Sequence, residues 1–178
     1  MCSSDLIGSQ IAGAYGLTYE RTASQDIGFG LRQLVDIAVR ALSPGVNDPT
    51  SAVHAISHLS ALLCDLTKMP PQPRAVADEE GVVRLLQRTH EFGSLLEVAV
   101  QQVRRYGVGD PGVTERLYNL LQEVAFVSDT SEHRALLAEQ LTRLDESVAA
   151  ESYDDVERRR FAQCSARSAA ALQGEWLR

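Results

Sequence analysis

The fold of this chain is constrained most by two apolar helical segments that are separated by a turn rich in proline, glycine, asparagine and aspartate. Apolar positions from Ile27 to Leu42 recur every three or four residues, which is the spacing of one helical face. Ser43-Pro44-Gly45 ends that segment, and Asp48-Pro49 opens the next, because aspartate accepts bonds from free first-turn amides and proline is tolerated there. We therefore predict a helix capped by Thr22 or Ser24, a turn, and a second helix starting at Asp48-Pro49.

The rest of the chain predicts four further helices and a hairpin. The helices are expected at residues 90–106, 111–127, 131–149 and 154–177, and their short links favour antiparallel neighbours. Apolar runs at 74–77 and 82–86 flank a turn in the manner of a β-hairpin. Because a lone hairpin is marginal in water, the alternating segment around Tyr15 is expected to add a third strand. The predicted fold is mainly α with a minor α+β character: about six helices in an up-and-down layer, with a small antiparallel sheet on which the helices can pack.

Composition indicates one globular domain and excludes several partners. With 178 residues, 44% of them hydrophobic, the chain can bury a core without disulfides or metals. A formal net charge of −7 opposes binding to nucleic acid or to anionic lipid surfaces. Cys64 and Cys164 are interpreted as buried thiols, and no metal or other cofactor is expected. No run reaches the roughly eighteen apolar residues of a membrane-spanning helix, so this stretch alone is expected to be soluble.

Polar residues along the first helix and in its flanking turns form the candidate site. The full set is Arg21, Asp26, Arg32, Asp36, Arg40, Asn47 and Asp48. Within it, Arg32, Asp36 and Arg40 are four residues apart and form a ladder opposite the apolar face. Three interpretations stay open: a solvated ion ladder, a buried structural network, or a ligand site. No catalytic residue can be assigned.

The turn between the two helices has both a structural and a binding interpretation. Gly45 can take a positive backbone angle, and Asn47 and Asp48 can bond the backbone within the turn. If the turn binds a ligand, a cation is favoured, since Asp48 and Asn47 offer hard oxygen ligands. His54 and His58 lie one turn apart on the next helix, and we interpret them as exposed histidines instead of a metal site.

The same stretch resembles the bacterial predicted-membrane-protein family called domain of unknown function 2254. The resemblance is strong from Tyr19 to Leu66. It rests on Arg21-Thr22, Gln25-Asp26, the run from Gly30 to Ala38, the run from Ala41 to Gly45, and Asn47-Asp48-Pro49. The resemblance implies several transmembrane helices ahead of the motif and a parent protein in the bacterial cell membrane. It also implies that the upstream transmembrane region is a partner.

We therefore expect residues 8–178 to form a single soluble helical domain, the C-terminal part of a longer membrane protein. The expected role is structural, regulatory or sensing, and not enzymatic. One alternative is a small-molecule or cation binding domain, or an enzyme, that uses the polar motif. Another is a homo-oligomerisation module, which an exposed apolar stripe on the last two helices would favour. Residues 1–7 are interpreted as a non-native leader, because Cys2 to Leu6 can be encoded by the end of a common sequencing adapter.

Overall fold

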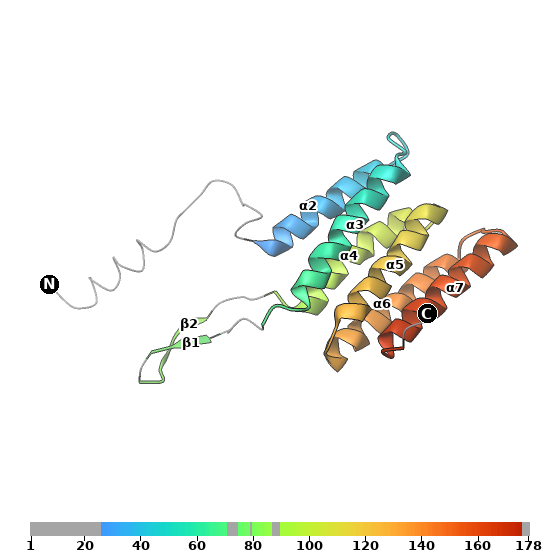
Figure 1. Cartoon of the computed structure of the whole chain (residues 1–178). Helices are drawn as coiled ribbons and strands as arrows, with labels where there is room; N and C mark the ends of the chain where they lie inside the picture. Colours follow the sequence, from blue (N-terminus) through green and yellow to red (C-terminus); the bar gives the residue numbers. More distant parts are fainter. Residues whose placement is uncertain (1–25, 71–74, 79, 87–89, 176–178) are drawn as a thin grey trace.

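The computed structural model describes residues 26–70, 75–78, 80–86 and 90–175, which form six helices and one β-hairpin (Figure 1). The elements are α2 (Ile27–Ala41), α3 (Pro49–Leu66), β1 (Ala75–Ala77), β2 (Val83–Leu86), α4 (Phe92–Gly107), α5 (Pro111–Val127), α6 (Ser131–Ala149) and α7 (Asp155–Leu172). The prediction of a mainly α fold is confirmed. The helix α7 ends earlier than predicted, because Gly174 takes a positive φ of 76° and lets the chain leave the helix.

Side-chain caps start five of the six helices in the described part of the chain. The capping residues are Asp26, Asp48, Asp110, Thr130 and Asp154. Asp48-Pro49 opens α3 as predicted. The prediction that Thr22 or Ser24 caps the first helix is wrong, because Asp26 fills this position and accepts from the Phe29 amide at 3.0 Å. A carboxylate complements the positive end of the helix dipole, so the helix begins at the next residue.

The helices are arranged with α5 near the centre of the body. Helix α3 packs between α2 and α5, and α5 in turn packs against α7 (Figure 1). Helix α4 packs chiefly against α2 and α6, and α6 also contacts α5 and α7. The arrangement departs from a simple up-and-down order, because α4 packs more on α2 and α6 than on its chain neighbour α5. Helix α2 therefore lies at the edge of the body, where part of its surface stays uncovered.

The core is aliphatic on the α2 side and aromatic on the α7 side. Leu31 and Val35 of α2 and Ile56 and Leu59 of α3 are buried there. On the other side three rings meet at the junction of α5 and α7. Phe161 stacks on Tyr118 with ring centroids 6.3 Å apart and meets Tyr153 edge-on at 4.7 Å. Both halves thus contribute to one continuous core.

The hairpin stands apart from the helical body. Strands β1 and β2 pair antiparallel, with Ala75 opposite Leu86 and an irregularity after Val76. Asp78 closes the turn, since its carboxylate accepts from the Val82 amide at 2.9 Å and from Arg84 Nε at 2.6 Å. Neither strand packs on any described helix, so the expectation that the helices pack on this sheet is not met. The third strand predicted near Tyr15 lies outside the described residues.

Candidate functional site

Asp48 is held by hydrogen bonds at the start of α3. Its Oδ1 accepts from the Ser51 amide at 3.1 Å, and its Oδ2 accepts from the Ser51 hydroxyl at 2.5 Å. The Asp48 amide donates to Ala41 O at 2.8 Å, which ties the end of α2 to the start of α3. The Ser51 hydroxyl, and then its amide, hold the pKa of Asp48 below its ordinary value, because both donate to the charged form. The carboxylate therefore acts as a cap in a closed turn.

Asn47 provides the backbone conformation that reverses the chain. It is the one non-glycine residue with a positive φ in the described part, at 47°. Gly45, which could also have taken this conformation, does not have a positive φ. Asparagine tolerates the left-handed region because its short polar side chain can bond locally. The turn is closed by the Val46 and Asn47 amides, which donate to Ser43 O at 3.0 and 2.9 Å.

Asp26 caps the opposite end of α2, where the helix starts. Besides capping the helix, its Oδ1 lies 3.2 Å from Nε2 of His90, which lies two residues before the first residue of α4. A Cβ added at Gly28 would come within 3.0 Å of the same imidazole, so the glycine permits this approach. Sequence reasoning missed the pairing, because nothing local relates His90 to a residue sixty-four positions earlier. Asp26 thus links the motif to the second half of the chain.

The predicted site residues do not form one cluster. Arg32, Asp36 and Arg40 are all exposed, and among the residues described here none of the three forms an ion pair with another. Arg21 lies outside the described residues. Asp26 and Asp48 are separated by the length of α2, about 20 Å for its 15 residues. The structure therefore separates the set into two caps, a turn residue and an open outer face.

A groove runs along α2 where it meets α3. Its volume is about 840 Å³, and it is open to solvent. The lining residues are Ile27, Gly30, Gln33, Leu34, Asp36, Ile37, Arg40, Ala41, Val46, Asp48, Ser51 and Leu62. The lining is mainly apolar, and Ile37 and Val46 are 54% and 56% exposed. Three predicted site residues, Asp36, Arg40 and Asp48, border this groove.

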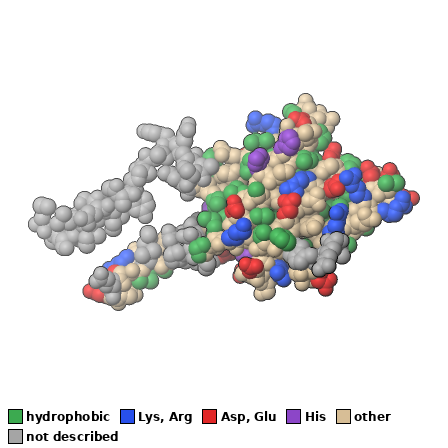
Figure 2. Space-filling view, in the orientation of Figure 1, with side chains coloured by type: hydrophobic (Ala, Val, Ile, Leu, Met, Phe, Trp, Pro, Cys, Tyr) green, Lys and Arg blue, Asp and Glu red, His purple; other side chains and the backbone are tan. Residues whose placement is uncertain are grey.

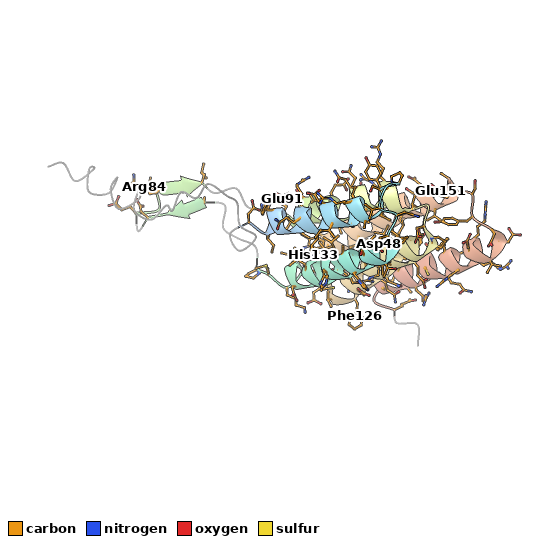
Figure 3. All side chains as sticks on the ribbon, turned by 90° about the horizontal axis from the view of Figure 1, so that it is seen from above. Asp48, Arg84, Glu91, Phe126, His133 and Glu151 are labelled. Carbon is orange, nitrogen blue, oxygen red and sulfur yellow. The ribbon has the colours of Figure 1, made fainter. Side chains whose placement is uncertain are left out.

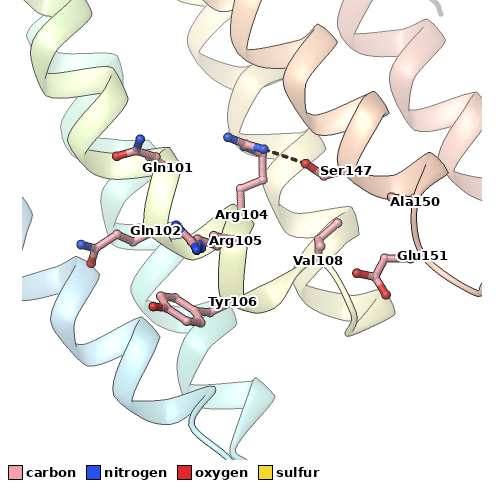
Figure 4. Close-up of a pocket in the computed structure, with 9 residues that line it drawn as sticks. All are labelled: Gln101, Gln102, Arg104, Arg105, Tyr106, Val108, Ser147, Ala150 and Glu151. Atoms are coloured by element: carbon pink, nitrogen blue, oxygen red, sulfur yellow. Dashed lines mark hydrogen bonds between the residues drawn. The ribbon is translucent and has the colours of Figure 1, made fainter.

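A second hollow of about 470 Å³ lies between the ends of α4 and α6 (Figure 4). Arg104 bridges these two helices there, donating from Nη1 to the Ser147 hydroxyl at 2.6 Å and to Arg143 O at 3.3 Å. Its Nε is buried and has no hydrogen-bond partner in the described part of the protein. None of the predicted site residues lines this hollow. We interpret Arg104 as a tie between helices.

Sequence reasoning also missed a polar link between α3 and α5. Arg116 donates to both carboxylate oxygens of Glu123 at 2.9 Å and from Nε to the Ser57 hydroxyl at 2.9 Å. The Ser60 hydroxyl also donates to Glu123. Desolvation opposes ionisation of Glu123, but Arg116 and Ser60 outweigh it and keep its pKa below the ordinary value. The available signal was the pair of serines on the apolar face of α3.

The cysteines and histidines form no metal centre in the described part. Cys164 is buried as predicted, and Cys64 is half-buried, where desolvation raises its pKa. His54 and His58 are exposed, in agreement with their interpretation, and histidines are visible on the surface of the helical body in Figure 2. Within the residues the structure describes, no three histidine, cysteine or acidic side chains come together to hold a metal ion. Figure 3 shows Asp48 on this body and Arg84 out on the hairpin.

Comparison with known proteins places the chain in a family. It is 34% identical over 155 residues to uncharacterised proteins of Mycobacterium bovis and of two strains of Mycobacterium tuberculosis, and the match covers 87% of this chain. The same match covers 30% of each relative, so the chain spans about a third of their length. No solved structure matches. None of the described helices is long and apolar enough to cross a membrane. The pattern that defines the predicted membrane proteins of family DUF2254 matches residues 3–123, and the chain belongs to that family.

Proposed function

We propose that the chain is a non-enzymatic, soluble domain of a membrane protein and supports the assembly or regulation of the membrane part. In this proposal the motif from Arg21 to Pro49 has a structural role: it holds the two ends of α2 in place, and we call it the clasp. The observation that carries the proposal is that two of the three motif carboxylates in the described residues, Asp26 and Asp48, are engaged in helix capping, while Asp36 is exposed. Asp26 holds the start of α2 and His90, and Asp48 holds the α2–α3 turn.

Chemistry within the motif would require groups that converge on one point. Asp26 caps the start of α2 and Asp48 caps the start of α3, so the two lie at opposite ends of α2, and the ladder residues between them are exposed. A capping carboxylate that accepts from amides in the first turn has fewer free lone pairs for a substrate or a metal. These contacts support a role in holding the fold more than a role in catalysis.

The proposal is tested by a thermal-shift screen of the whole chain with Asp48→Ala and Asp48→Asn as variants. Asparagine is as good an N-cap as aspartate, whereas alanine provides no acceptor. We expect Asp48→Ala to lower the melting temperature and Asp48→Asn to retain most of it. Mg²⁺, Ca²⁺, Mn²⁺, phosphate and citrate should leave all three melting temperatures unchanged. A ligand that stabilises the parent chain but neither variant would overturn the clasp.

A small-molecule or cation binding domain remains a second candidate, supported by the groove. Asp36, Arg40 and Asp48 all border it, and its apolar floor could hold the body of an organic ligand. The same screen tests this candidate when Arg40→Ala is added, since Arg40 is exposed and is no part of either cap. A stabilising anion whose effect disappears in Arg40→Ala supports the binding role.

A further inference from the structure

The groove has the residue spacing of a surface that receives another helix. Ile27, Gly30, Leu34, Ile37 and Ala41 all line it, and they follow one another at intervals of three, four, three and four residues. That alternation is the seam pattern of helices that pack lengthwise on each other. It differs from the buried face of the same helix, which is formed by Leu31, Val35 and Ala38 together with Ala41. On this second face Ala41 is buried, Ile27, Gly30 and Leu34 are half-buried and Ile37 is 54% exposed, so the body covers it only in part.

Charges that have no partner on their own helix flank the exposed part of this seam at Ile37. Asp36 and Arg40 border the groove, are exposed, and form no ion pair with each other in the described structure. If two α2 helices pack antiparallel about a two-fold axis near residue 38, residue 36 of each lies opposite residue 40 of the other. Each Asp36 then faces the Arg40 of the second copy. A two-fold interface requires this self-complementarity, because both copies present the same surface.

We propose that the α2 face of the groove is an interface between two copies of this chain, arranged antiparallel about a two-fold axis beside Ile37. The occupant is a second copy because, apart from the α3 cap Asp48, the groove is bordered by one acid, Asp36, and one base, Arg40. These two lie at equal distances on either side of residue 38, so each faces its opposite charge when a second α2 runs antiparallel. An anionic lipid surface would meet Asp36 as well as Arg40, and the chain as a whole carries a net charge of −7. Gly30 lines the groove and has no side chain, so it lets the two backbones approach closely.

Among the described residues, the exposed apolar side chains favour an interface on α2 over one on the last two helices. Ile37 and Val46 are both more than half exposed and lie in the groove. In contrast, Val156 is the one large hydrophobic side chain that the described parts of α6 and α7 expose. The stripe that would have placed an oligomer contact on the last two helices is therefore missing from those residues, and the contact is assigned to α2.

The first test measures the mass of the whole chain by sedimentation over a range of concentrations. We expect the mass of the parent to rise from 19.5 kDa towards twice that value with concentration. Ile37→Glu should weaken association at least about tenfold, since it places two like charges on the axis. Val156→Glu, at a site 64% exposed, is the matched control and should associate like the parent. A parent that stays at 19.5 kDa at every concentration overturns the interface.

A charge exchange tests the orientation of the two copies. Asp36→Arg alone and Arg40→Asp alone each place like charges opposite one another twice, so each should weaken association about tenfold or more. The double variant restores opposite charges at both points and should return to within about threefold of the parent. Failure of the double variant to recover, with circular dichroism unchanged, rejects the antiparallel pairing. The clasp proposed above is unaffected by any of these outcomes, because neither residue caps a helix.

Discussion

Polar side chains are hydrogen-bonded to one another at the junction of α5, α6 and α7, but they are exposed to solvent on the outer face of α2. At the junction, the Tyr118 hydroxyl donates to Asp145 Oδ1 at 2.7 Å, and the Ser165 hydroxyl donates to the other oxygen at 2.9 Å. On α2, Arg32, Asp36 and Arg40 remain exposed and unpaired with one another in the described structure. One region is therefore closed by its own hydrogen bonds, whereas the other leaves its charged side chains and Ile37 exposed to solvent.

The buried tyrosines show how completely the junction is closed. The Tyr153 hydroxyl donates to Val108 O and lies 3.1 Å from the Thr114 hydroxyl, while the Ser168 hydroxyl donates to Tyr118 O at 3.1 Å. Burial, followed by the bond to Asp145, raises the pKa of Tyr118 far above its ordinary value of 10.0. A buried polar group that lost its partner would be costly, so each bond also specifies how the helices pack.

The largest expected difference between the two regions concerns their apolar side chains. Phe161 is 2% exposed and touches both tyrosine rings, so Phe161→Ala should lower the free energy of unfolding by about 3–5 kcal/mol. Ile37 is 54% exposed, and Ile37→Ala should change it by no more than about 0.5 kcal/mol. Urea denaturation at low protein concentration measures both. Equal losses in the two variants would mean that the α2 face is not open.

The tyrosine bond to Asp145 should account for the next largest effect. Tyr118→Phe removes the donor, and we expect a loss of about 1–3 kcal/mol near neutral pH. Because folding raises the pKa of Tyr118, this contribution is complete below pH 10 and declines as the pH rises above that value. Unfolding measured from pH 8 to 11 should show the parent approaching the variant. Tyr106→Phe, at a residue 59% exposed, is the control, and it should show no such convergence.

How far the sequence predicts the structure depends on whether a signal is local. Pro111 and Ser131 begin helices where the sequence placed them, because aspartate or threonine caps and proline act within one turn. The hairpin was also predicted from local turn residues. The partner of Asp26 was not, since His90 reaches it only after the chain has folded back. The division of the candidate site into caps and an exposed ladder likewise depends on which helix covers α2.

The cap at Asp48 should produce a smaller and pH-dependent effect. Its pKa in the folded protein lies below the ordinary value of 3.8, so its contribution is present above that pH and is lost as the pH falls further. Asp48→Asn keeps a neutral acceptor and should lose less stability than the parent between about pH 5 and pH 3. The melting temperatures of the two proteins, recorded by circular dichroism, should therefore converge on acidification. Parallel curves would show that the Ser51 bonds do not favour the charged form.

Arg32 provides the smallest effect and the strictest test of an open α2 face. Its side chain is exposed, and in the described structure it has no ion pair with Asp36, so Arg32→Gln should change the free energy of unfolding by less than about 0.5 kcal/mol. Raising the salt concentration should leave the difference unchanged, because a solvated charge without a close partner has little attraction to screen. Urea denaturation at low and high salt measures both quantities. A loss above about 1 kcal/mol that salt removes would mean that the ladder is an ion network, and α2 would then resemble the closed junction after all.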